Sequence, residues 1–189
     1  INIFSMDRNK LLSVGEGGVL VTNNRDLFEK CLLISDFGLR LKSELKLKKN
    51  KKYIETGFGF KHRIHPMAAA AALYEMTKLK YYIKLRHKRL NFITKKLKKI
   101  NGLEPPITKD YVNRGAFYSY RIKFKKEYFK NINFNFFITA LQKEGLQVRK
   151  AGNPPLETLP YFKICKPKNI KSSKIFYNTT FSIPTFTFE

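Results

Sequence analysis

The first part of the chain alternates apolar runs with polar, glycine-containing segments. Residues 1–6 and 17–22 are short apolar runs, the second rich in β-branched residues, and each is predicted to form a strand. Asn24 then stands at the N-cap of a predicted helix that runs to about Phe37 and ends at Gly38. The apolar residues expected on one side of this helix are Leu27, Phe28, Cys31 and Ile34.

A much longer helix is predicted to begin at His65-Pro66, because proline is favoured in the first turn of a helix. Apolar residues recur from there at steps of three and four, which gives one apolar stripe on an otherwise basic helix. They are Leu79, Ile83, Leu90, Ile93, Leu97 and Ile100. Asn101-Gly102 is expected to end the helix shortly after Ile100.

Beyond the proline pair at 105–106 the pattern becomes that of a small α+β unit. Residues 117–124 alternate between two faces, as expected for a strand with one covered side. One face would carry Phe117, Ser119, Arg121 and Lys123, and the other Tyr118, Tyr120, Ile122 and Phe124. A helix at 135–144 ended by Gly145, a strand at 146–149, a helix near 172–178 and a strand at 180–183 complete the chain. The predicted fold class is therefore α/β with a smaller α+β unit.

The composition is that of a packed protein with an unusual charge. Of the 189 residues, 43% are apolar and 14% aromatic, which excludes a disordered chain, and no run is long and apolar enough to span a membrane. The net charge is +24, from 38 Lys+Arg against 14 Asp+Glu, a balance typical of proteins that bind nucleic acid or anionic membranes. The lysines are spread along the chain, however. Their densest run, 42–52, falls in the segment 39–56, which is expected to be a solvated loop.

Neither cysteine belongs to a recognisable motif. Cys31 and Cys165 lie far apart without a CxxC pair, so neither a disulfide framework nor a metal site is expected, and a reducing compartment fits. The chain starts without Met, within what reads as a strand, and without a charged-then-apolar leader. We therefore expect these residues to be a fragment of a longer protein, and no secretion signal is visible in them.

One segment combines residues that suit cofactor chemistry. Lys10 lies just beyond the first predicted strand, on a loop that leads to the GEGG sequence at 15–18, and such loops often face a ligand cleft in α/β proteins. A lysine amine forms Schiff bases with carbonyl cofactors, and Ser5 offers a hydroxyl to a phosphate oxygen. Taken alone, the spacing leaves open the alternative that Lys10 is one more solvated loop lysine.

The whole string FSMDRNKLLSVGEGGVLVT resembles the signature of the DegT/DnrJ/EryC1/StrS family of pyridoxal-phosphate sugar aminotransferases. In that family Phe-Ser-Phe is followed after three residues by a lysine and, after four more, by GEGG and an apolar strand. The resemblance implies that Lys10 is the catalytic lysine, which forms the Schiff base with pyridoxal 5'-phosphate. It also implies that Ser5 contacts the phosphate of this cofactor.

Further segments match the family in the same order. Residues 35–38 resemble the segment after the following helix, and residues 59–63 resemble its glycine-x-asparagine-x-arginine motif, with an alanine pair behind it. Lys61 stands where the family has an asparagine that reaches the phosphate from the partner subunit, so it is either a phosphate ligand or a solvated lysine. Arg63 either orders the start of the long helix or binds an acidic substrate, and Glu16 is the other candidate substrate contact. Weaker matches at 143–146, 154–156 and 181–184 extend the resemblance along the chain.

The resemblance implies an α/β chain with pyridoxal-phosphate transferase fold type I, the aspartate-aminotransferase-like fold. Residues 1–80 would be the C-terminal part of the large cofactor-binding domain. Residues 81–104 would be a long connecting helix, and residues 105–189 the small α+β domain.

The activity implied is transfer of an amino group from glutamate or glutamine to a nucleotide-linked keto-sugar, in a cytoplasmic homodimer that serves polysaccharide biosynthesis. Lysine at position 10 argues against the related sugar dehydratases, which carry histidine there. The family's acidic residue for the pyridine nitrogen lies upstream of these 189 residues, so this chain alone is expected to be inactive. Two alternatives are weaker: a non-catalytic remnant of the aminotransferase fold, and a basic nucleic-acid-binding module. The net charge and the aromatic residues interleaved with lysine at 80–99 favour such a module, but the chain has no recognised nucleic-acid-binding motif, so nucleic acid is not the expected partner.

Overall fold

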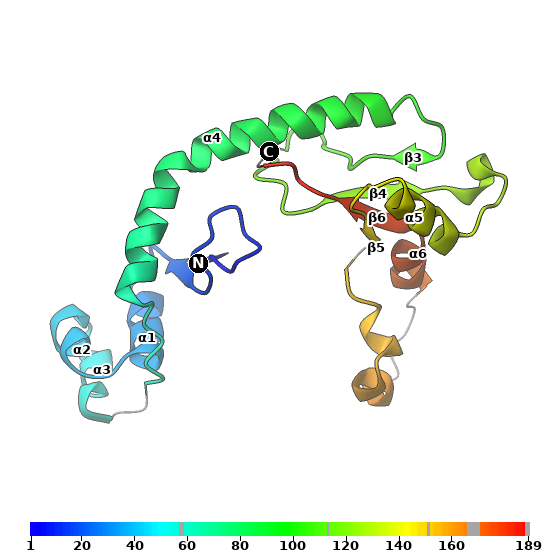
Figure 1. Ribbon diagram of the computed structural model, residues 1–189. Coiled ribbons are helices and arrows are strands. Elements are labelled where there is room, and N and C mark those ends of the chain that lie inside the picture. The colour runs from blue at the N-terminus through cyan, green and yellow to red at the C-terminus, as the bar shows by residue number, and fades with distance from the viewer. Residues whose placement is uncertain (57–58, 113, 151, 166–170, 188–189) are drawn as a thin grey trace. The chain divides into compact units, whose positions relative to one another are not determined.

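The computed structural model describes residues 1–56, 59–112, 114–150, 152–165 and 171–187 (Figure 1). The chain divides into two compact units, Ile1–Lys80 and Tyr81–Glu189, and one long helix, α4 (Pro66–Leu97), contributes to both. The helix begins at the predicted proline and ends three residues before Ile100. Within the described ranges, no helix has the length and apolar character needed to cross a lipid bilayer.

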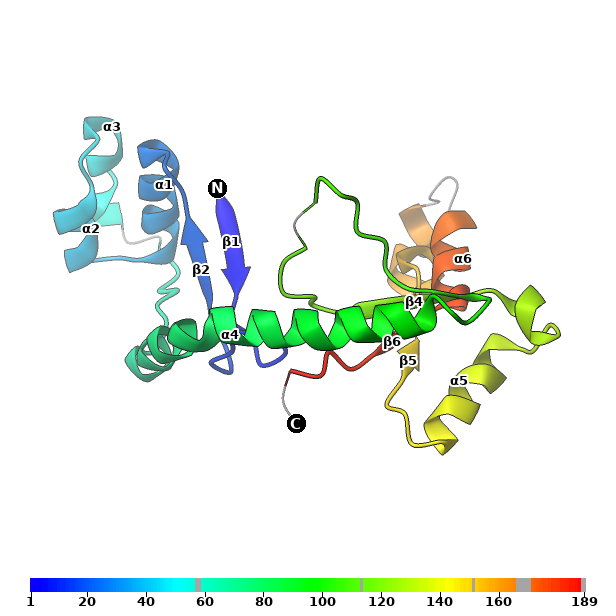
Figure 2. The same ribbon diagram turned by 90° about the horizontal axis from the view of Figure 1, so that it is seen from above.

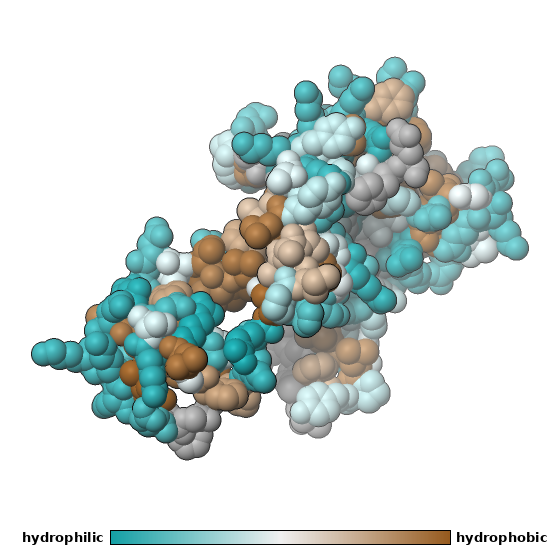
Figure 3. Space-filling model, turned by 60° about the vertical axis from the view of Figure 1, so that its left-hand side comes forward, coloured by the Kyte–Doolittle hydropathy of each residue, from teal (hydrophilic) through white to brown (hydrophobic). Residues whose placement is uncertain are grey.

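The first unit opens with a two-stranded antiparallel sheet. β1 (Asn2–Ser5) pairs with β2 (Gly18–Val21), and both strands lie within the predicted apolar runs. Their side chains are exposed all along, with Ile3 at 74% and Phe4 at 58%. In the space-filling view, hydrophobic side chains likewise reach the surface among hydrophilic ones (Figure 3). Strands that are apolar on both sides are typical of sheets covered on both faces, and an isolated two-stranded ribbon is only marginally stable in water.

The helix after β2 has the predicted cap but a different end. In α1 (Arg25–Ser35), the Asn24 side chain accepts a hydrogen bond of 3.0 Å from the Leu27 amide. The helix stops at Asp36 and not at Gly38. Gly38, with φ of +107°, instead starts a further helix, α2 (Leu39–Glu44).

The prediction of a loop at 39–56 is wrong. This segment contains α2, α3 (Lys48–Lys51) and a 3₁₀ turn, η1 (Ile54–Thr56). The apolar pair Leu41 and Leu45 lies four residues apart on α2 and its end, and both side chains are buried against Leu32 of α1. The lysine run hid this short amphipathic pattern.

The same packing corrects the predicted face of α1. Phe28 and Leu32 face the α2 contact, whereas Leu27 and Ile34 are 38% and 58% exposed. Cys31, a free thiol, is half-buried between these faces. The Cys165 side chain lies outside the described residues.

A buried carboxylate joins α1 to the α2–α3 segment. Glu29 is fully buried and accepts hydrogen bonds from the Lys46 amide at 2.7 Å, the Asn50 side chain at 2.9 Å and Arg25 Nε at 2.8 Å. Burial alone raises the pKa of Glu29, but these donors outweigh it and lower the pKa from an ordinary 4.5 to about 2. The Leu47 amide, at 3.2 Å from both carboxylate oxygens, adds to the effect.

The second unit is built on a four-stranded antiparallel sheet in the order β3-β4-β6-β5 (Figure 1). Figure 2 shows β4, β6 and β5 of this sheet from above. Its strands are β3 (Leu103–Glu104), β4 (Tyr120–Phe124), β5 (Arg149–Lys150) and β6 (Thr180–Ile183). Its helices, besides the second half of α4, are α5 (Phe134–Lys143) and α6 (Lys171–Thr179). The described 3₁₀ segments are η2 (Lys126–Phe129), η3 (Leu156–Thr158) and η4 (Pro160–Cys165).

One face of this sheet carries the core. Ile122 of β4 lies opposite Phe181 of β6, and both are 2% exposed. Leu90 of α4 and Ile138 of α5 pack into the same cluster. The Tyr120 hydroxyl, also buried, lies 2.6 Å from Thr94 Oγ1, which fixes α4 to β4 by a polar contact inside the core.

The alternation predicted for 117–124 holds only from residue 120 onward. Phe117 has φ of +48°, in the left-handed region, and this turn of the backbone reverses the faces of Phe117 and Tyr118 relative to the strand. Phe117 is therefore buried and Tyr118 is 64% exposed, opposite to the prediction. The strand predicted at 146–149 is likewise reduced to the short β5.

We predict that Glu29→Gln lowers the melting temperature of the chain at neutral pH, because a neutral amide loses the charged hydrogen bonds of the buried carboxylate. A carboxyl whose pKa is lowered on folding stabilises the folded state at pH values above 4.5, and this contribution is lost as the pH falls toward about 2. The wild-type melting temperature should therefore fall over this range more steeply than that of the variant. Glu55→Gln, at a side chain 84% exposed, is the matched control in thermal unfolding by circular dichroism. Equal effects of both substitutions would contradict this role of Glu29.

Candidate functional site

The loop that carries Lys10 is closed by main-chain hydrogen bonds. The Met6 amide donates to Gly17 O at 2.9 Å, and Met6 O accepts from the Val14 amide at 3.0 Å. The Arg8 amide also donates to Gly15 O at 2.9 Å. The antiparallel pairing of β1 and β2 thus continues beyond the strands, and the connection is a defined loop.

Lys10 ends a tight turn at the start of this loop. Its amide donates to Asp7 O at 2.9 Å, while Asp7 Oδ1 accepts from the amide and the side chain of Asn9, both at 3.1 Å. The Asn9 amide is the main cause of a lowered pKa of Asp7, and Lys10 contributes through its charge. The ionised carboxylate of Asp7 thus stabilises the turn through its hydrogen bonds with Asn9. The Lys10 side chain is half-buried.

Ser5 is the last residue of β1 and lies on the same hairpin as Lys10. Its hydroxyl is exposed and accepts a long hydrogen bond of 3.4 Å from the Asp7 amide. The hairpin thus presents one hydroxyl and one primary amine, as the sequence analysis expected for Ser5 and Lys10.

Lys61 lies on a second segment that is attached to the end of α1. The amides of Phe60 and His62 donate to Ile34 O and Ser35 O, each at 2.7 Å, and so satisfy carbonyls that a helix end leaves unpaired. A Cβ at Gly59 would overlap the carbonyl group of Asp36, so only glycine permits this approach. Lys61 follows with φ of +22° and an exposed side chain.

Glu16 and Arg63 line one pocket within the first unit. The pocket is open, with a volume of about 510 Å³, and Gly17 and Gly18 form part of its wall. Its remaining lining residues are Val14, His62, Ile64, His65 and Ala68. The GEGG loop and the segment before α4 therefore meet here, and the pocket combines a guanidinium, two imidazoles and one carboxylate.

Sequence reasoning missed the part of the two histidines in this pocket. Their spacing around Arg63, at positions 62 and 65, was the available signal. His65 also caps α4, since its Nδ1 accepts from the Met67 amide at 3.2 Å. Ser5, Lys10 and Lys61 are not among the residues that line the pocket.

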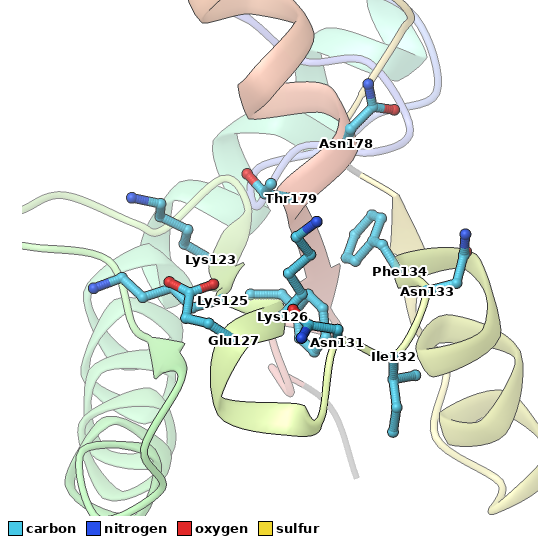
Figure 4. A pocket seen from close by; sticks show the side chains of 11 residues that line it. Lys123, Lys125, Lys126, Glu127, Asn131, Ile132, Asn133, Phe134, Asn178 and Thr179 are labelled. Carbon is cyan, nitrogen blue, oxygen red and sulfur yellow. The ribbon is translucent and has the colours of Figure 1, made fainter.

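Another pocket, of about 400 Å³, lies in the second unit, and none of the candidate site residues Ser5, Lys10, Glu16, Lys61 and Arg63 lines it (Figure 4). Lys123, Lys125 and Lys126 line it together with Asn178 and Thr179 at the end of α6. Glu104 forms ion pairs with Lys125 and, at 3.6 Å, with Lys123. Two of its three lysines are thus already paired within the unit.

The donor set of the hairpin fits pyridoxal 5'-phosphate. The cofactor needs an amine for its carbonyl carbon and donors for a phosphate dianion. On one hairpin, Lys10 offers an amine for the carbonyl carbon and Ser5 offers a hydroxyl donor for the phosphate. The cation of Lys61 also suits a phosphate. Among the described residues, no group of three or more His, Cys, Asp or Glu side chains has the arrangement of a metal site.

A family model, the DegT/DnrJ/EryC1/StrS aminotransferase family, matches residues 1–187 of the chain. The UDP-4-amino-4,6-dideoxy-N-acetyl-beta-L-altrosamine transaminase of Campylobacter jejuni subsp. jejuni (strain 81-176) is 26% identical over 97% of this chain and 46% of its own length. A putative L-glutamine:3-amino-2,3-dideoxy-scyllo-inosose aminotransferase of Micromonospora echinospora is 25% identical over 85% of this chain and 37% of its own. The chain thus spans about half the length, or less, of the curated relatives that it matches.

Solved structures of similar fold include the Helicobacter pylori aminotransferase PseC, with a TM-score of 0.76 and 22% identity over 96% of this chain and 47% of that one. The E. coli GDP-4-keto-6-deoxy-D-mannose-3-dehydratase with bound hydrated PLP has a TM-score of 0.79 and 16% identity, over 99% and 50%. These likenesses confirm the predicted fold class, α/β with pyridoxal-phosphate transferase fold type I.

We predict that Gly59→Ala detaches the segment 59–62 from the end of α1. The added methyl group has no room beside the Asp36 carbonyl group, and such overpacking costs about 1–3 kcal/mol. The variant should melt several degrees lower, and the amides of Phe60 and His62 should exchange faster with deuterium. Gly115→Ala is the control, because a Cβ there meets no atom within 4 Å. Unchanged protection of the two amides would contradict the proposed attachment.

Proposed function

Because the chain belongs to the DegT/DnrJ/EryC1/StrS aminotransferase family, we propose that it carries the lysine half-site of a pyridoxal-phosphate-dependent nucleotide-sugar aminotransferase. The observation that carries this proposal is the hairpin that places Ser5 and Lys10 on one closed loop, inside a family match that covers residues 1–187. Since the chain spans about half of its relatives, the complete enzyme would need the part of the fold that lies outside these residues.

In this proposal Lys10 has two tasks. Its Nζ would hold the cofactor through the carbonyl carbon, and its free amine would take up and return the proton that moves between substrate and cofactor carbons. When bound, the cofactor supplies an electron sink for the carbon that loses this proton. The Ser5 hydroxyl would donate a hydrogen bond to the cofactor phosphate. The cation of Lys61 would bind a cofactor phosphate too, and by the family pattern this is the phosphate of the cofactor held by the partner subunit.

The pocket between the GEGG loop and the start of α4 would receive the nucleotide-linked sugar. Arg63 pairs well with two oxygens of a phosphate, and His62 and His65 add hydrogen-bond donors beside it. Glu16, which lines the same pocket, would accept from a sugar hydroxyl or an amine. This assigns an anion-binding role to Arg63 and a sugar-facing role to Glu16.

Lysine at position 10 favours amino transfer over dehydration. The fold alone does not separate the two, because an aminotransferase and a dehydratase both resemble the chain with TM-scores above 0.75. In the family pattern the dehydratases carry histidine at this position, and an imidazole does not form a Schiff base with a carbonyl cofactor. We propose a nucleotide-linked keto-sugar as the acceptor because the relatives are sugar or aminocyclitol aminotransferases.

We also propose that the complete protein is a cytoplasmic homodimer. The exposed apolar side chains of β1 and β2 favour further covering layers, from the rest of the fold or from a second subunit. The half-buried free Cys31 suits a reducing compartment.

Reductive trapping tests the central assignment. The chain is mixed with pyridoxal 5'-phosphate and reduced with borohydride, and the modified lysines are mapped by mass spectrometry. We expect the pyridoxyl group mainly on Lys10, because the neighbouring Ser5 hydroxyl retains the cofactor there. Lys10→Arg should abolish this label, whereas Lys30→Arg, on an exposed helical face, should leave it unchanged.

Label spread over the surface lysines in proportion to their exposure would refute Lys10 as the cofactor lysine. With glutamate and a nucleotide keto-sugar, the 189 residues alone should transfer no amino group, even where Lys10 is labelled. Full turnover by this chain alone would contradict the proposed half-site while leaving the lysine assignment intact.

A further inference from the structure

The outer face of α4 carries a continuous basic surface. Residues 76–103 contain no aspartate or glutamate. Within the second unit, Lys84, Lys88, Asn91 and Lys95 are all exposed and follow one another at steps of four, three and four. Such steps place side chains on one side of a helix, and the three lysines span about 16 Å along it at 1.5 Å per residue.

These lysines have no acidic neighbour in the part of the chain that the structure describes. Each ion pair given by the described residues involves other lysines or arginines, as in Lys30 and Lys49 with Asp26, or Lys123 and Lys125 with Glu104. No ion pair given by the described residues therefore offsets the positive charge of these three lysines.

Two exposed aromatic rings border the lysines. Tyr81 and Phe92 are each 61% exposed, and Lys96 Nζ lies 5.4 Å from the centroid of the Phe92 ring. Such large apolar side chains are costly to leave in water unless something covers them. Rings beside a row of cations are the arrangement on which single-stranded nucleic acids bind, with phosphates on the lysines and bases stacked on the rings.

The opposite side of α4 makes a lipid membrane a poorer fit than a nucleic acid. Leu90 is fully buried, and Ile93 and Leu97 pack on the sheet core of the second unit. A helix that lies in a membrane interface needs a broad apolar face free for the acyl chains. Here that face is used inside the protein, and only the basic face remains outward.

We infer that the basic face of α4, formed by Lys84, Lys88 and Lys95 with Tyr81 and Phe92, binds single-stranded nucleic acid. This function is separate from amino transfer, because none of these residues lies in the hairpin or in the pocket of the first unit. The sequence analysis predicted a basic helix here, and the structure adds that these three lysines are exposed along one side of it.

Fluorescence anisotropy with a labelled oligouridylate of about 20 nucleotides tests the inference. The variant replaces Lys84, Lys88 and Lys95 with Gln in the full 189-residue chain. At fixed salt its affinity should fall at least tenfold. The slope of log affinity against log salt should decrease by about 2, since each lost phosphate contact on a single strand contributes about 0.7. Far-UV circular dichroism should be unchanged, because all three side chains are exposed.

The matched control replaces Lys126, Lys130 and Lys143 with Gln, which are also exposed, lie in the same unit and remove the same charge. This variant should keep its affinity within twofold. An equal loss in both variants would overturn the inference, because binding would then follow net charge alone. Competition by phosphatidylserine vesicles as strong as that by unlabelled oligouridylate would also overturn it, in favour of a membrane surface.

Discussion

The hydrogen bonds that close the loop between β1 and β2 determine where Lys10 lies. Met6 accepts from Val14 and donates to Gly17, so the hairpin continues past the strand ends and returns the chain to the GEGG sequence. These bonds join main-chain groups, and the turn at Asp7 is held by a carboxylate whose lowered pKa keeps it ionised. The Lys10 amine is therefore carried by a backbone of fixed course, as the proposed covalent cofactor site requires.

A different kind of support holds the second segment of the site. Phe60 and His62 bond to the last carbonyls of α1, and α1 is in turn fixed to the residues after it by the buried carboxylate of Glu29. The positions of Lys61 and Arg63 thus depend on a helix whose own placement needs a satisfied buried charge. Loss of Glu29 would act on the candidate site through α1 without changing any residue proposed to contact substrate.

The sequence predicted most elements whose signal is local. Asn24 before its helix, Pro66 at the start of α4 and the β-branched run of β2 act within a few residues, and the structure contains all three features. The errors arose where tertiary packing decides. Leu41 forms a helix face only because Leu32 lies opposite, and Phe117 is buried only because its backbone turns into the left-handed region. The meeting of Glu16 with Arg63 had no local signal either, since it depends on how the glycine loop and the start of α4 fold together.

The basic residues that give the chain its large positive charge lie in different kinds of surroundings. On α1, Asp26 is shared between Lys30 and Lys49, at 2.8 and 2.9 Å, and near β3 Glu104 serves two lysines, so part of the basic excess is used in local structure. The cation at Arg63 lies in a pocket whose size and donors suit a phosphate-bearing ligand. Lys84, Lys88 and Lys95 of α4 form no ion pair among the described residues, and they do not line the pocket of the first unit. A compositional bias toward lysine explains their number, but it does not explain an acid-free face bordered by two exposed aromatic rings, and that face suits the partner of opposite charge that we propose.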